Sequence, residues 1–477
     1  MGTREKKSIV SFLFISSVLL AGIARAQTPV WSQVFPTING IGQDIVTDGE
    51  GNTYVVAASG DQVSRAIPEG IYLAKIDPRG TIRWSHNRMG TALALDQIGN
   101  LFVVTRTPEG TSELTKHGRD GQILWSRPIG PPPCIVGALV ATDGGGNIYL
   151  GGYHKAPANN PVDQDVCLTK LNPAGAVLWS KSWSTPYNDV PKRIRIDGRN
   201  HVYFGVHLAE SATPAEGNRL QLIKLDENGN ELWGKVLQGH PGSFDHYLID
   251  GEGRSFVIGD SPLPSGGIQI TKFAQDGTKQ WTQAWNTEGR AHAGPLALDD
   301  EGNLYAAGGA YVEKKYSRFF LLKYNPRGAL LSAHLEKTTV YDGPTGMALD
   351  SAGNLFLTGV TYGGLDESQV QGKPQAFVIK HAPYAPPSFN CLRATTIQEK
   401  LICQDDELAS FDAAIATAFK THLARSGNRR RATLEQQTWL REQRNTCTTR
   451  EQLAAAMVAR IDALKAGGLR RSKPGGR

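Results

Sequence analysis

Lysine recurs at regular intervals in this sequence, and each copy brings a cation that could bind an anion. In its fullest form the motif places an Asp two residues after the lysine and a Trp nine residues after it, as in Lys75, Asp77 and Trp84. A lysine can also lay its aliphatic stem on apolar neighbours and keep its charge in water. We expect this solvated arrangement, rather than a basic ring, for the whole series. The series comprises Lys75, Lys116, Lys170, Lys224, Lys272, Lys323 and Lys380.

A second set of polar residues lies in the irregular stretches between the motifs. Tyr187, His240 and His292 are the candidates there for contact with a small ligand. The 11 histidines are scattered, without a His-x-x-x-His pair of the kind that forms a helix-borne zinc site. We find no Gly-x-Ser-x-Gly elbow, phosphate-binding loop or paired-carboxylate signature. We therefore predict no catalytic residue, no metal and no cofactor. Other polar residues of these stretches are Asn188, Asp189, Asp245, Arg290, Tyr341 and Asp342.

Seven copies of an Asp-x-x-Gly-Asn motif position these residues. An Asp carboxylate can accept backbone N–H bonds at the start of a turn, and Gly can take the positive φ that the turn requires. Two copies depart from the pattern. The fourth reads as one residue short, Asp197-Gly198-Arg199-Asn200, and in the fifth Arg254 replaces the Asn. The copies begin at Asp48, Asp96, Asp143, Asp197, Asp250, Asp299 and Asp350.

Each repeat predicts four short strands joined by two tight turns on one face of the molecule. Strand-rich repeats of this length indicate a propeller or a solenoid. The longer connections then lie on the opposite face, where we expect any ligand site near the mouth of the channel. In the first repeat the four predicted strands are Asp44 to Asp48, Asn52 to Ala58, Ile71 to Asp77 and Thr81 to His86.

The two ends of the array are complementary. Trp31 to Phe35 reads as a fourth strand with no preceding three, and Phe377 to Lys380 reads as a third strand with no fourth. We predict that they pair and complete the last blade, because closure removes exposed strand edges. The fold predicted is an all-β seven-bladed β-propeller with N-terminal strand closure, followed by a small all-α domain. The Trp series is expected to pack between blades, and the sixth blade lacks it at Leu331-Ser332.

The Asp-x-x-Gly-Asn turns resemble the bacterial β-propeller repeats of the SBBP and NHL kind. The Lys-to-Trp half is similar to the tail of the quinoprotein dehydrogenase repeat. These resemblances imply the fold over about three quarters of the chain, but no activity, because propellers host many unrelated functions.

The chain divides into five segments. Arg4, Lys6 and Lys7 precede an apolar stretch, and Ala24-Arg25-Ala26 is a small-residue cleavage site, so residues 1–26 are predicted to be a signal peptide. A propeller at 27–382, a Pro-rich linker at 383–387, a helical domain at 388–466 and a basic tail at 467–477 follow. The prediction is a periplasmic or secreted protein with no transmembrane segment after signal removal.

The two domains differ in net charge. The formal net charge of the chain is +6, yet residues 388–477 hold 16 Lys and Arg against 9 Asp and Glu. A basic helical domain favours an anionic partner, such as a phosphate-bearing envelope polymer, which Arg429, Arg430 and Arg431 would contact. No nucleic-acid partner is predicted.

The helical domain shows helix signals throughout. Thr396 to Glu399 and Thr448 to Glu451 read as capping boxes. Leu408 to Leu423 keeps a helical spacing that Gly427 ends, and Leu434 to Arg444 and Leu453 to Leu464 predict two more helices.

The same region resembles the LprI-type domain, a family named for a lysozyme inhibitor of bacterial envelopes. The resemblance implies that Trp439, Arg441 and Arg444 contact a partner, with a lysozyme as one candidate. Core packing with a surface ion pair is the alternative for Trp439 and Arg444. One departure is the absence of a fourth Cys from Thr448 to Leu453. The matching residues are Ser388 to Cys391, Glu399, Ile402, Cys403, Leu408, Asp412, Gln437, Trp439, Arg441, Arg444 and Cys447.

Five cysteines in an exported protein leave one over in any pairing scheme. Cys134 and Cys167 are predicted to pair within the propeller, and Cys391 or Cys403 is predicted to be oxidised. Cys447 is the remaining candidate.

Two classes of function follow. The first is an exported, non-catalytic binding or scaffold protein of the cell envelope, whose helical domain binds a protein or a polymer. The alternative is a quinoprotein-type propeller enzyme, or a propeller that binds a small ligand.

Overall fold

The computed structural model describes most of the propeller strands and the helical domain. The described residues are 30–35, 40–59, 72–106, 112–129, 136–153, 165–184, 189–209, 218–237, 244–261, 266–286, 290–313, 316–337, 343–362, 374–382, 387–389 and 394–465. The predicted signal peptide and the basic tail lie outside these residues.

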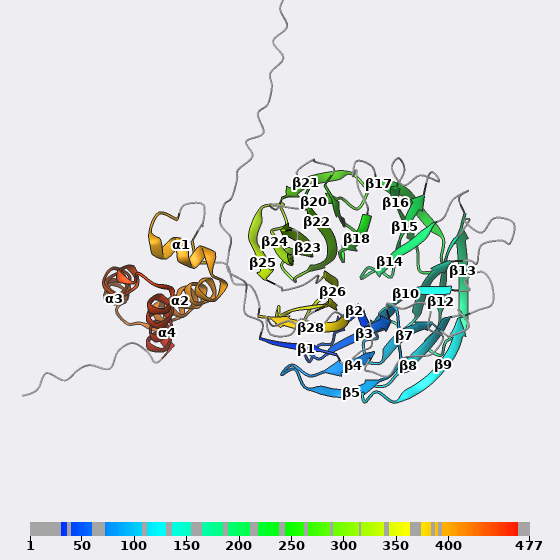
Figure 1. The fold of residues 1–477 in the computed structure, drawn as a ribbon, viewed down its shortest axis with the longest axis horizontal. Helices are drawn as coiled ribbons and strands as arrows, with labels where there is room; N and C mark the ends of the chain where they lie inside the picture. Colours follow the sequence, from blue (N-terminus) through cyan, green and yellow to red (C-terminus); the bar gives the residue numbers. More distant parts are fainter. Residues whose placement is uncertain are drawn as a thin grey trace, which may run out of the picture.

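Seven four-stranded antiparallel sheets are arranged around a central axis (Figure 1). The first strand of each sheet contacts the first strands of both neighbouring sheets, so the first strands form a closed circle. The prediction of a seven-bladed β-propeller is confirmed.

Blade one contains β2 (Gly40–Thr47), β3 (Thr53–Ser59), β4 (Leu73–Ile76) and β5 (Ile82–His86); blade two contains β6 (Ala92–Leu95), β7 (Leu101–Arg106), β8 (Ser112–His117) and β9 (Ile123–Ile129). Blade three contains β10 (Val136–Thr142), β11 (Ile148–Tyr153), β12 (Val166–Leu171) and β13 (Val177–Trp183); blade four contains β14 (Val190–Ile196), β15 (Val202–Ala209), β16 (Asn218–Leu225) and β17 (Glu231–Leu237). Blade five contains β18 (Phe244–Ile249), β19 (Ser255–Asp260), β20 (Ile268–Phe273) and β21 (Lys279–Trp285); blade six contains β22 (Arg290–Leu298), β23 (Leu304–Glu313), β24 (Tyr316–Tyr324) and β25 (Leu330–Lys337).

Blade seven joins the two ends of the array. It contains β26 (Gly343–Leu349), β27 (Leu355–Thr361), β28 (Gln375–His381) and, as its outer strand, β1 (Trp31–Val34). β1 pairs antiparallel with β28, with Trp31 opposite Lys380. Just after β1, Phe35 is 2% exposed and packs in a cluster with residues of blades one and seven. The predicted N-terminal strand closure is therefore confirmed.

The motif aspartates organise the first turn of each blade. Asp48 Oδ1 accepts the backbone N–H groups of Glu50 and Asn52, and Oδ2 accepts the Asn52 side-chain amide. Gly51 has φ +79°, a conformation that a residue with a side chain rarely adopts. These bonds engage both carboxylate oxygens, as the turn interpretation predicts.

The fourth copy of the motif is not shortened. Asn200 takes the glycine position with φ 61°, and its N–H donates to the Asp197 carbonyl as Gly51 does to Asp48. His201 takes the Asn position and places its Nδ1 2.9 Å from Asp197 Oδ2. The prediction of a missing residue is wrong because Asn tolerates the left-handed conformation, so the turn keeps its length with different residues.

The repeated lysine and tryptophan join each blade to the next. In blade three, Lys170 is 6% exposed, and its Nζ lies 5.1 Å from the centre of the Tyr149 ring. The same nitrogen lies 3.8 Å from Asp143 Oδ2 and donates to the Glu227 carbonyl of blade four, 3.0 Å away. Trp179, the cross-strand partner of Lys170, donates its indole N–H to that carbonyl as well. One carbonyl in blade four therefore accepts two bonds from blade three.

The lysine series corrects the expectation of solvated ammonium groups. Each of the seven Nζ atoms lies between 4.7 and 5.3 Å from an aromatic ring of its own blade. Lys75 and Lys170 each combine the ring with a carboxylate and a backbone carbonyl, and these groups together replace the water around the charge. Lys170, Lys224, Lys272, Lys323 and Lys380 are nine-tenths or more buried.

The tryptophans pack between blades, as predicted. Trp31 of blade seven covers the turn of blade one, where a Cβ at Gly80 would lie 2.9 Å from the indole. Ser332 occupies the equivalent position in blade six, opposite Lys323. The next blade explains this absence, because its third and fourth strands are the two ends of the array and have no tight turn between them. A tryptophan at Ser332 would have no such turn to cover.

The helical domain contains α1 (Ile397–Gln404), α2 (Asp406–Arg425), α3 (Arg429–Glu442), η2 (Arg444–Thr446) and α4 (Arg450–Lys465). Ile402, Leu408, Ile415, Trp439 and Leu453 contribute to one buried cluster. The predicted capping box of α1 is present, with reciprocal bonds between Thr396 and Glu399. None of the described helices is long and apolar enough to cross a membrane.

The start of α4 differs by one residue from the prediction. Thr449 Oγ1 accepts the N–H of Gln452, and Gln452 Oε1 accepts the N–H of Thr448. The bonds at this helix start therefore use Gln452 in place of Glu451, with Thr449 as the hydroxyl acceptor and Thr448 as the backbone donor. Gln and Glu can both fill this role, so the sequence offers two adjacent registers.

A buried histidine makes the stability of the propeller sensitive to acid. His381 at the end of β28 is 1% exposed, and neither ring nitrogen has a hydrogen-bond partner among the described residues. Burial lowers its pKa to about 4, with a further contribution from His334. The unfolded chain takes up the proton near pH 6.5, whereas the folded chain stays neutral down to about pH 4. Stability is therefore lost as the pH falls from about 6.5 to 4.

Replacing His381 should remove this loss. Phe273 occupies the same position in blade five, immediately after the motif lysine, so His381→Phe is a matched substitution. Urea unfolding at pH 7.5 and pH 4.5 should show the wild type losing about 2–3 kcal/mol more than the variant. An equal loss in both proteins would show that another group controls the acid sensitivity.

Candidate functional site

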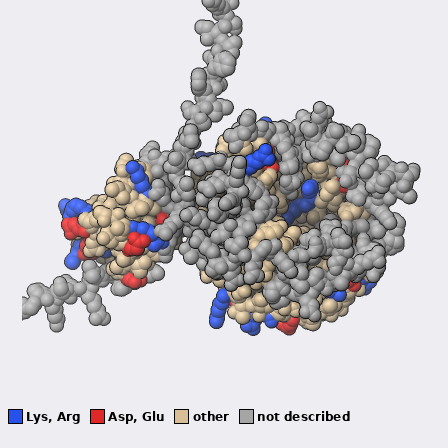
Figure 2. All heavy atoms as spheres, viewed as in Figure 1, with Lys and Arg blue, Asp and Glu red and all other residues tan. Residues whose placement is uncertain are grey.

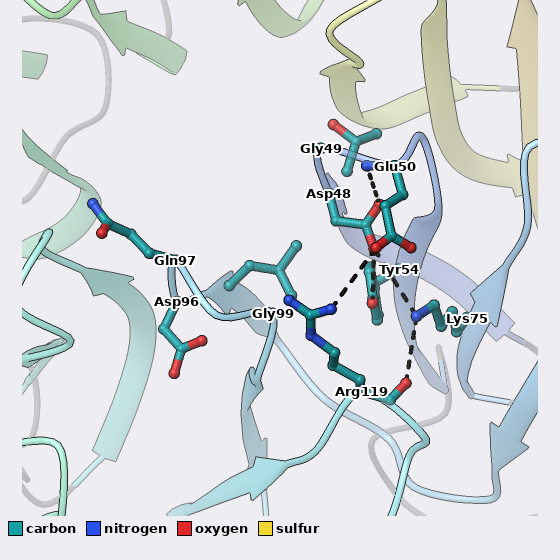
Figure 3. A pocket seen from close by; sticks show the side chains of 11 residues that line it. Asp48, Gly49, Glu50, Tyr54, Lys75, Asp96, Gln97, Gly99 and Arg119 are labelled. Carbon is teal, nitrogen blue, oxygen red and sulfur yellow. Dashed lines mark hydrogen bonds and ion pairs between the residues drawn. The ribbon is translucent and has the colours of Figure 1, made fainter.

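A cavity of about 340 Å³ lies between the first turns of blades one and two (Figure 3). A second cavity of about 470 Å³ shares Glu50, Lys75 and Arg119 with it and extends to Asp77 and Trp84. The tight turns line both cavities, so they lie on the face opposite to the long connections. The first cavity is lined by Thr47, Asp48, Gly49, Glu50, Tyr54, Lys75, Leu95, Asp96, Gln97, Gly99 and Arg119.

The polar groups at the centre of this cavity are engaged with one another. Tyr54 donates its hydroxyl to Asp48 Oδ2 at 3.1 Å, and Lys75 Nζ lies 4.0 Å from the same oxygen. Burial raises the pKa of Tyr54 above its usual value, and the Asp48 charge raises it further. The phenol therefore remains a hydrogen-bond donor at neutral pH.

Arg119 forms the rim of the cavity. Its Nε donates to the Ile98 carbonyl at 2.7 Å, and its Nη1 lies 3.8 Å from Glu50 Oε1. Both side chains of this ion pair are exposed, so water screens the interaction. The cavity offers a small polar molecule a mixed-charge rim, but its described side chains contain no activated nucleophile. We therefore interpret the cavity as part of the packing interface between blades one and two. No group of three or more His, Cys, Asp or Glu among the described residues is arranged to hold a metal ion.

The structure describes only some of the predicted loop residues. Tyr187 and His240 lie outside the described residues, as do Asn188, Tyr341 and Asp342. His292 lies near the start of β22, with its Nδ1 3.1 Å from Asp260 Oδ2. Asp260 Oδ1 also accepts the Ala293 N–H. Among the described residues, His292 therefore belongs to a contact between blades five and six, and a ligand-binding role for it stays a prediction.

The three predicted contact residues of the helical domain have different environments. Trp439 is 5% exposed and lies in the core, where the Arg460 guanidinium is 5.7 Å from the centre of its ring. Arg444 is also buried, with Nη1 3.7 Å from Asp412 Oδ1. Asp412 in turn accepts the Ser388 N–H and hydroxyl. These contacts support structural roles for Trp439 and Arg444.

Arg441 differs from these two because its side chain is exposed. Its only described ion pair is with the adjacent Glu442, at 2.7 Å. Arg441 is therefore the one member of the predicted trio that can reach a partner without rearrangement of the core.

The cysteines fall into two groups. Cys167 and Cys403 are disulfide-bonded, whereas Cys447 is free and buried. Cys134 and Cys391 lie outside the described residues. The pairing of Cys134 with Cys167 therefore stays a prediction.

Two arginines on β14 were not among the predicted site residues. Arg193 and Arg195 alternate along the innermost strand of blade four, and both are exposed. Alignment of the repeats on their motif aspartates shows that the other blades have no basic residue at the Arg195 position. That comparison is the sequence signal that could have identified them.

Comparisons with known proteins show distant similarity. No family model matches the chain, so the LprI-type resemblance stays a prediction. Over 245 residues the chain is 22% identical to an uncharacterized WD repeat-containing protein, L264, of Acanthamoeba polyphaga mimivirus. The match covers 46% of this chain but only 15% of that protein.

Two solved structures are likewise only distantly similar to this chain. YCF48 bound to D1 peptide is 10% identical with a TM-score of 0.45, and covers 77% of this chain and 99% of its own. A gluconolactonase from Xanthomonas campestris is 12% identical with a TM-score of 0.36, and covers 75% of this chain and 98% of its own. At these values neither structure bears on the activity or partners of this protein.

Proposed function

We propose that this protein is an exported, non-catalytic scaffold whose helical domain binds an anionic component of the cell envelope. The observation that carries this proposal is an exposed face of α3. Arg430, Leu434, Gln437 and Arg441 are spaced by four, three and four residues, so they lie on one side of the helix. All four are exposed, and Leu434 retains 62% of its accessible surface.

The opposite side of α3 holds the helix in place. Ala432 and Trp439 are its buried residues, and they pack toward the core of the domain. The exposed face is therefore available without any loss of core contacts. An exposed apolar side chain between two arginines suits a partner with anionic groups on an apolar or sugar framework.

Charge supports an anionic partner over a cationic one. Arg429, Arg430 and Arg431 begin α3, and the first turn of the helix has no acidic residue. Only Arg431 of these three forms a described ion pair, with Glu435 at 3.0 Å. Many lysozymes are cationic and would be repelled by this surface. Lysozyme inhibition, which the LprI-type resemblance implies, is therefore the second candidate.

The propeller supplies the frame in this proposal. Its repeated Asp, Lys and Trp side chains are engaged in turns and blade-to-blade contacts, as in Asp143, Lys170 and Trp179. These contacts are structural, and none of them requires a catalytic role for the residue. The alternative of a quinoprotein-type enzyme would require a site among the residues that remain.

Binding of the mature full chain to polyphosphate, a phosphate-bearing polymer, tests the proposal. The double substitution Arg430→Gln/Arg441→Gln should weaken binding roughly tenfold or more, at about 1 kcal/mol for each charge near an anionic surface. Binding of the wild type should also weaken with added salt. The matched control Lys420→Gln/Arg425→Gln removes two exposed charges from α2 and should change binding much less.

Three outcomes would replace this proposal. Equal polymer binding by both variants would show that the exposed face of α3 is not the contact surface. Inhibition of cell-wall lysis by a lysozyme, lost on Arg441→Gln, would favour the second candidate. Uptake of a quinone cofactor with a metal by the full chain would favour the enzyme.

A further inference from the structure

We propose that Arg193 and Arg195 form an oxyanion-binding site in the central channel of the propeller, for a small ligand that carries a phosphate group. This proposal is independent of the one for the helical domain. It rests on the position of the two arginines in the circle of first strands, on the lack of carboxylate partners for them, and on the side chains that replace them in other blades.

The two arginines lie on the same side of the innermost strand. β14 contacts β10 and β18, the first strands of the neighbouring blades, and the seven first strands surround the axis. Side chains two residues apart on a strand point the same way, with about 6.6 Å between their positions. Both arginines are exposed although Ile194 between them is buried. Because β14 is enclosed by its neighbours, solvent reaches these side chains through the channel.

Figure 2 shows a hollow at the centre of the ring of blades, on the face that is drawn. Blue Lys and Arg side chains are visible inside the central hollow, at the place that β14 occupies in Figure 1. A cationic group is therefore accessible from outside through this opening.

Arg195 has no charged equivalent in the other six blades. Each blade has a residue two positions before its motif aspartate, and each of these residues pairs with the aromatic residue six positions after that aspartate, as Arg195 pairs with Tyr203. Four of the six equivalents are alanine and the other two are valine and leucine, so Arg195 is the one charged side chain at this position. The equivalents are Val46, Ala94, Ala141, Leu248, Ala297 and Ala348.

Two other blades have a polar residue at the position equivalent to Arg193, but these residues do not fully neutralise the arginine charges. Asp44 and His246 are its polar equivalents, four residues before their motif aspartates. Asp44 Oδ2 accepts the Leu93 N–H at 2.8 Å, and Oδ1 accepts the Ile45 N–H at 3.0 Å. Burial raises the pKa of Asp44, although the Arg193 charge lowers it in part. Asp44 is therefore committed to backbone donors and compensates the arginines incompletely.

Neither guanidinium forms an ion pair with a carboxylate of the described residues. Asp250 is the acidic group whose charge affects the pKa of Arg195. Its carboxylate already pairs with Arg254 and accepts the backbone N–H groups of Glu252 and Arg254 in its own turn. Although the Arg195 side chain is accessible, the surrounding blades partly desolvate it and so lower its pKa; the Arg193 charge lowers this pKa further, whereas Asp250 raises it. Two like charges held together in this enclosure cost free energy, and a bound dianion would offset that cost.

The backbone at Arg193 is held in position by the next blade. The Tyr247 hydroxyl donates to the Arg193 carbonyl at 2.7 Å. Tyr247 fills the space over Gly205, where a Cβ would lie 1.8 Å from its hydroxyl oxygen. Gly205 is the cross-strand partner of Arg193. This contact fixes the strand from which both guanidinium groups project.

Two guanidinium groups suit a phosphate better than other small anions. Each presents a planar pair of N–H donors that matches two oxygens of a phosphate or a carboxylate. A phosphate monoester carries up to two negative charges on three terminal oxygens, so both arginines can bind it at once. Chloride, with one charge and no fixed geometry, gains less from the pair.

The test uses the mature full chain and the double variant Arg193→His/Arg195→Leu. This variant copies His246 and Leu248, which occupy the same positions in blade five, so it suits the fold of an inner strand. At pH 8 the introduced imidazole is mostly neutral. Titration with inorganic phosphate, by calorimetry and ³¹P nuclear magnetic resonance at constant ionic strength, should give saturable binding to the wild type. The variant should bind at least tenfold more weakly.

Stability measurements separate binding from a structural role. Without phosphate, the double variant should be at least as stable as the wild type, because it removes the repulsion between the two charges. The control Lys181→Gln/Arg199→Gln removes two exposed charges, one from β13 and one from the turn that follows β14, and should keep phosphate binding. Absence of binding to the wild type up to about 10 mM phosphate would overturn the proposal. Equal binding by the double variant, or its destabilisation without any change in binding, would do the same.

Discussion

Deleting residues 27–37 from the mature protein is expected to cause unfolding or aggregation. The deletion removes β1, and with it the outer strand of blade seven. Trp31 then no longer donates to the Pro78 carbonyl, and Gln33 no longer donates to the Gly80 carbonyl. Blades seven and one then keep only the contacts made by their other strands, and β28 becomes an exposed edge that can pair with another chain.

The expected loss is comparable to the total stability of a domain. Truncation of a buried Phe such as Phe35 alone costs about 3–5 kcal/mol, and a domain has about 5–15 kcal/mol in all. Size-exclusion chromatography and thermal unfolding measure the result. A deletion of residues 467–477 is the control, because it removes the same length of chain from the other end. A monomeric and equally stable β1 deletion would contradict the closure mechanism.

Replacing one buried lysine should have the second largest effect. Lys170→Met keeps the length of the stem but removes the charge that lies 3.8 Å from Asp143 Oδ2. The Asp143 side chain is 1% exposed, so the substitution leaves a buried carboxylate without its cation. The Glu227 carbonyl also loses one of its two donors. We expect a loss of about 3 kcal/mol, as for other broken buried ion pairs.

Urea unfolding measures this loss against Lys181→Met in the same blade. Lys181 is exposed on β13, so its substitution should stay within about 0.5 kcal/mol. Adding Asp143→Asn to Lys170→Met should recover part of the loss, since the uncompensated charge is removed. If Lys170→Met were no more costly than Lys181→Met, the lysine series would not stabilise the blade junctions.

Sequence patterns predicted the blades because each turn is a local structure. Asp48 and Gly51 lie within four residues of one another, and the bonds between the carboxylate and nearby N–H groups are available to the isolated segment. The same locality explains the capping box of Thr396 and Glu399. Strand closure by Trp31 to Val34 was predictable for another reason, because two incomplete repeats can complete only one blade.

The environment of the repeated cations was decided by the tertiary structure alone. Lys170 is buried because Glu227, 57 residues later, brings a carbonyl to its ammonium group. Trp439 and Arg444 are likewise placed in a core by helices that are distant in the sequence. A pattern of residue types reports spacing along the chain, whereas burial depends on which segment packs against it. The sequence by itself thus determined the turns, the repeat and the closed ring. Packing around the axis decided which charges are enclosed between blades and which, like Arg193 and Arg195, are left exposed on the innermost strand.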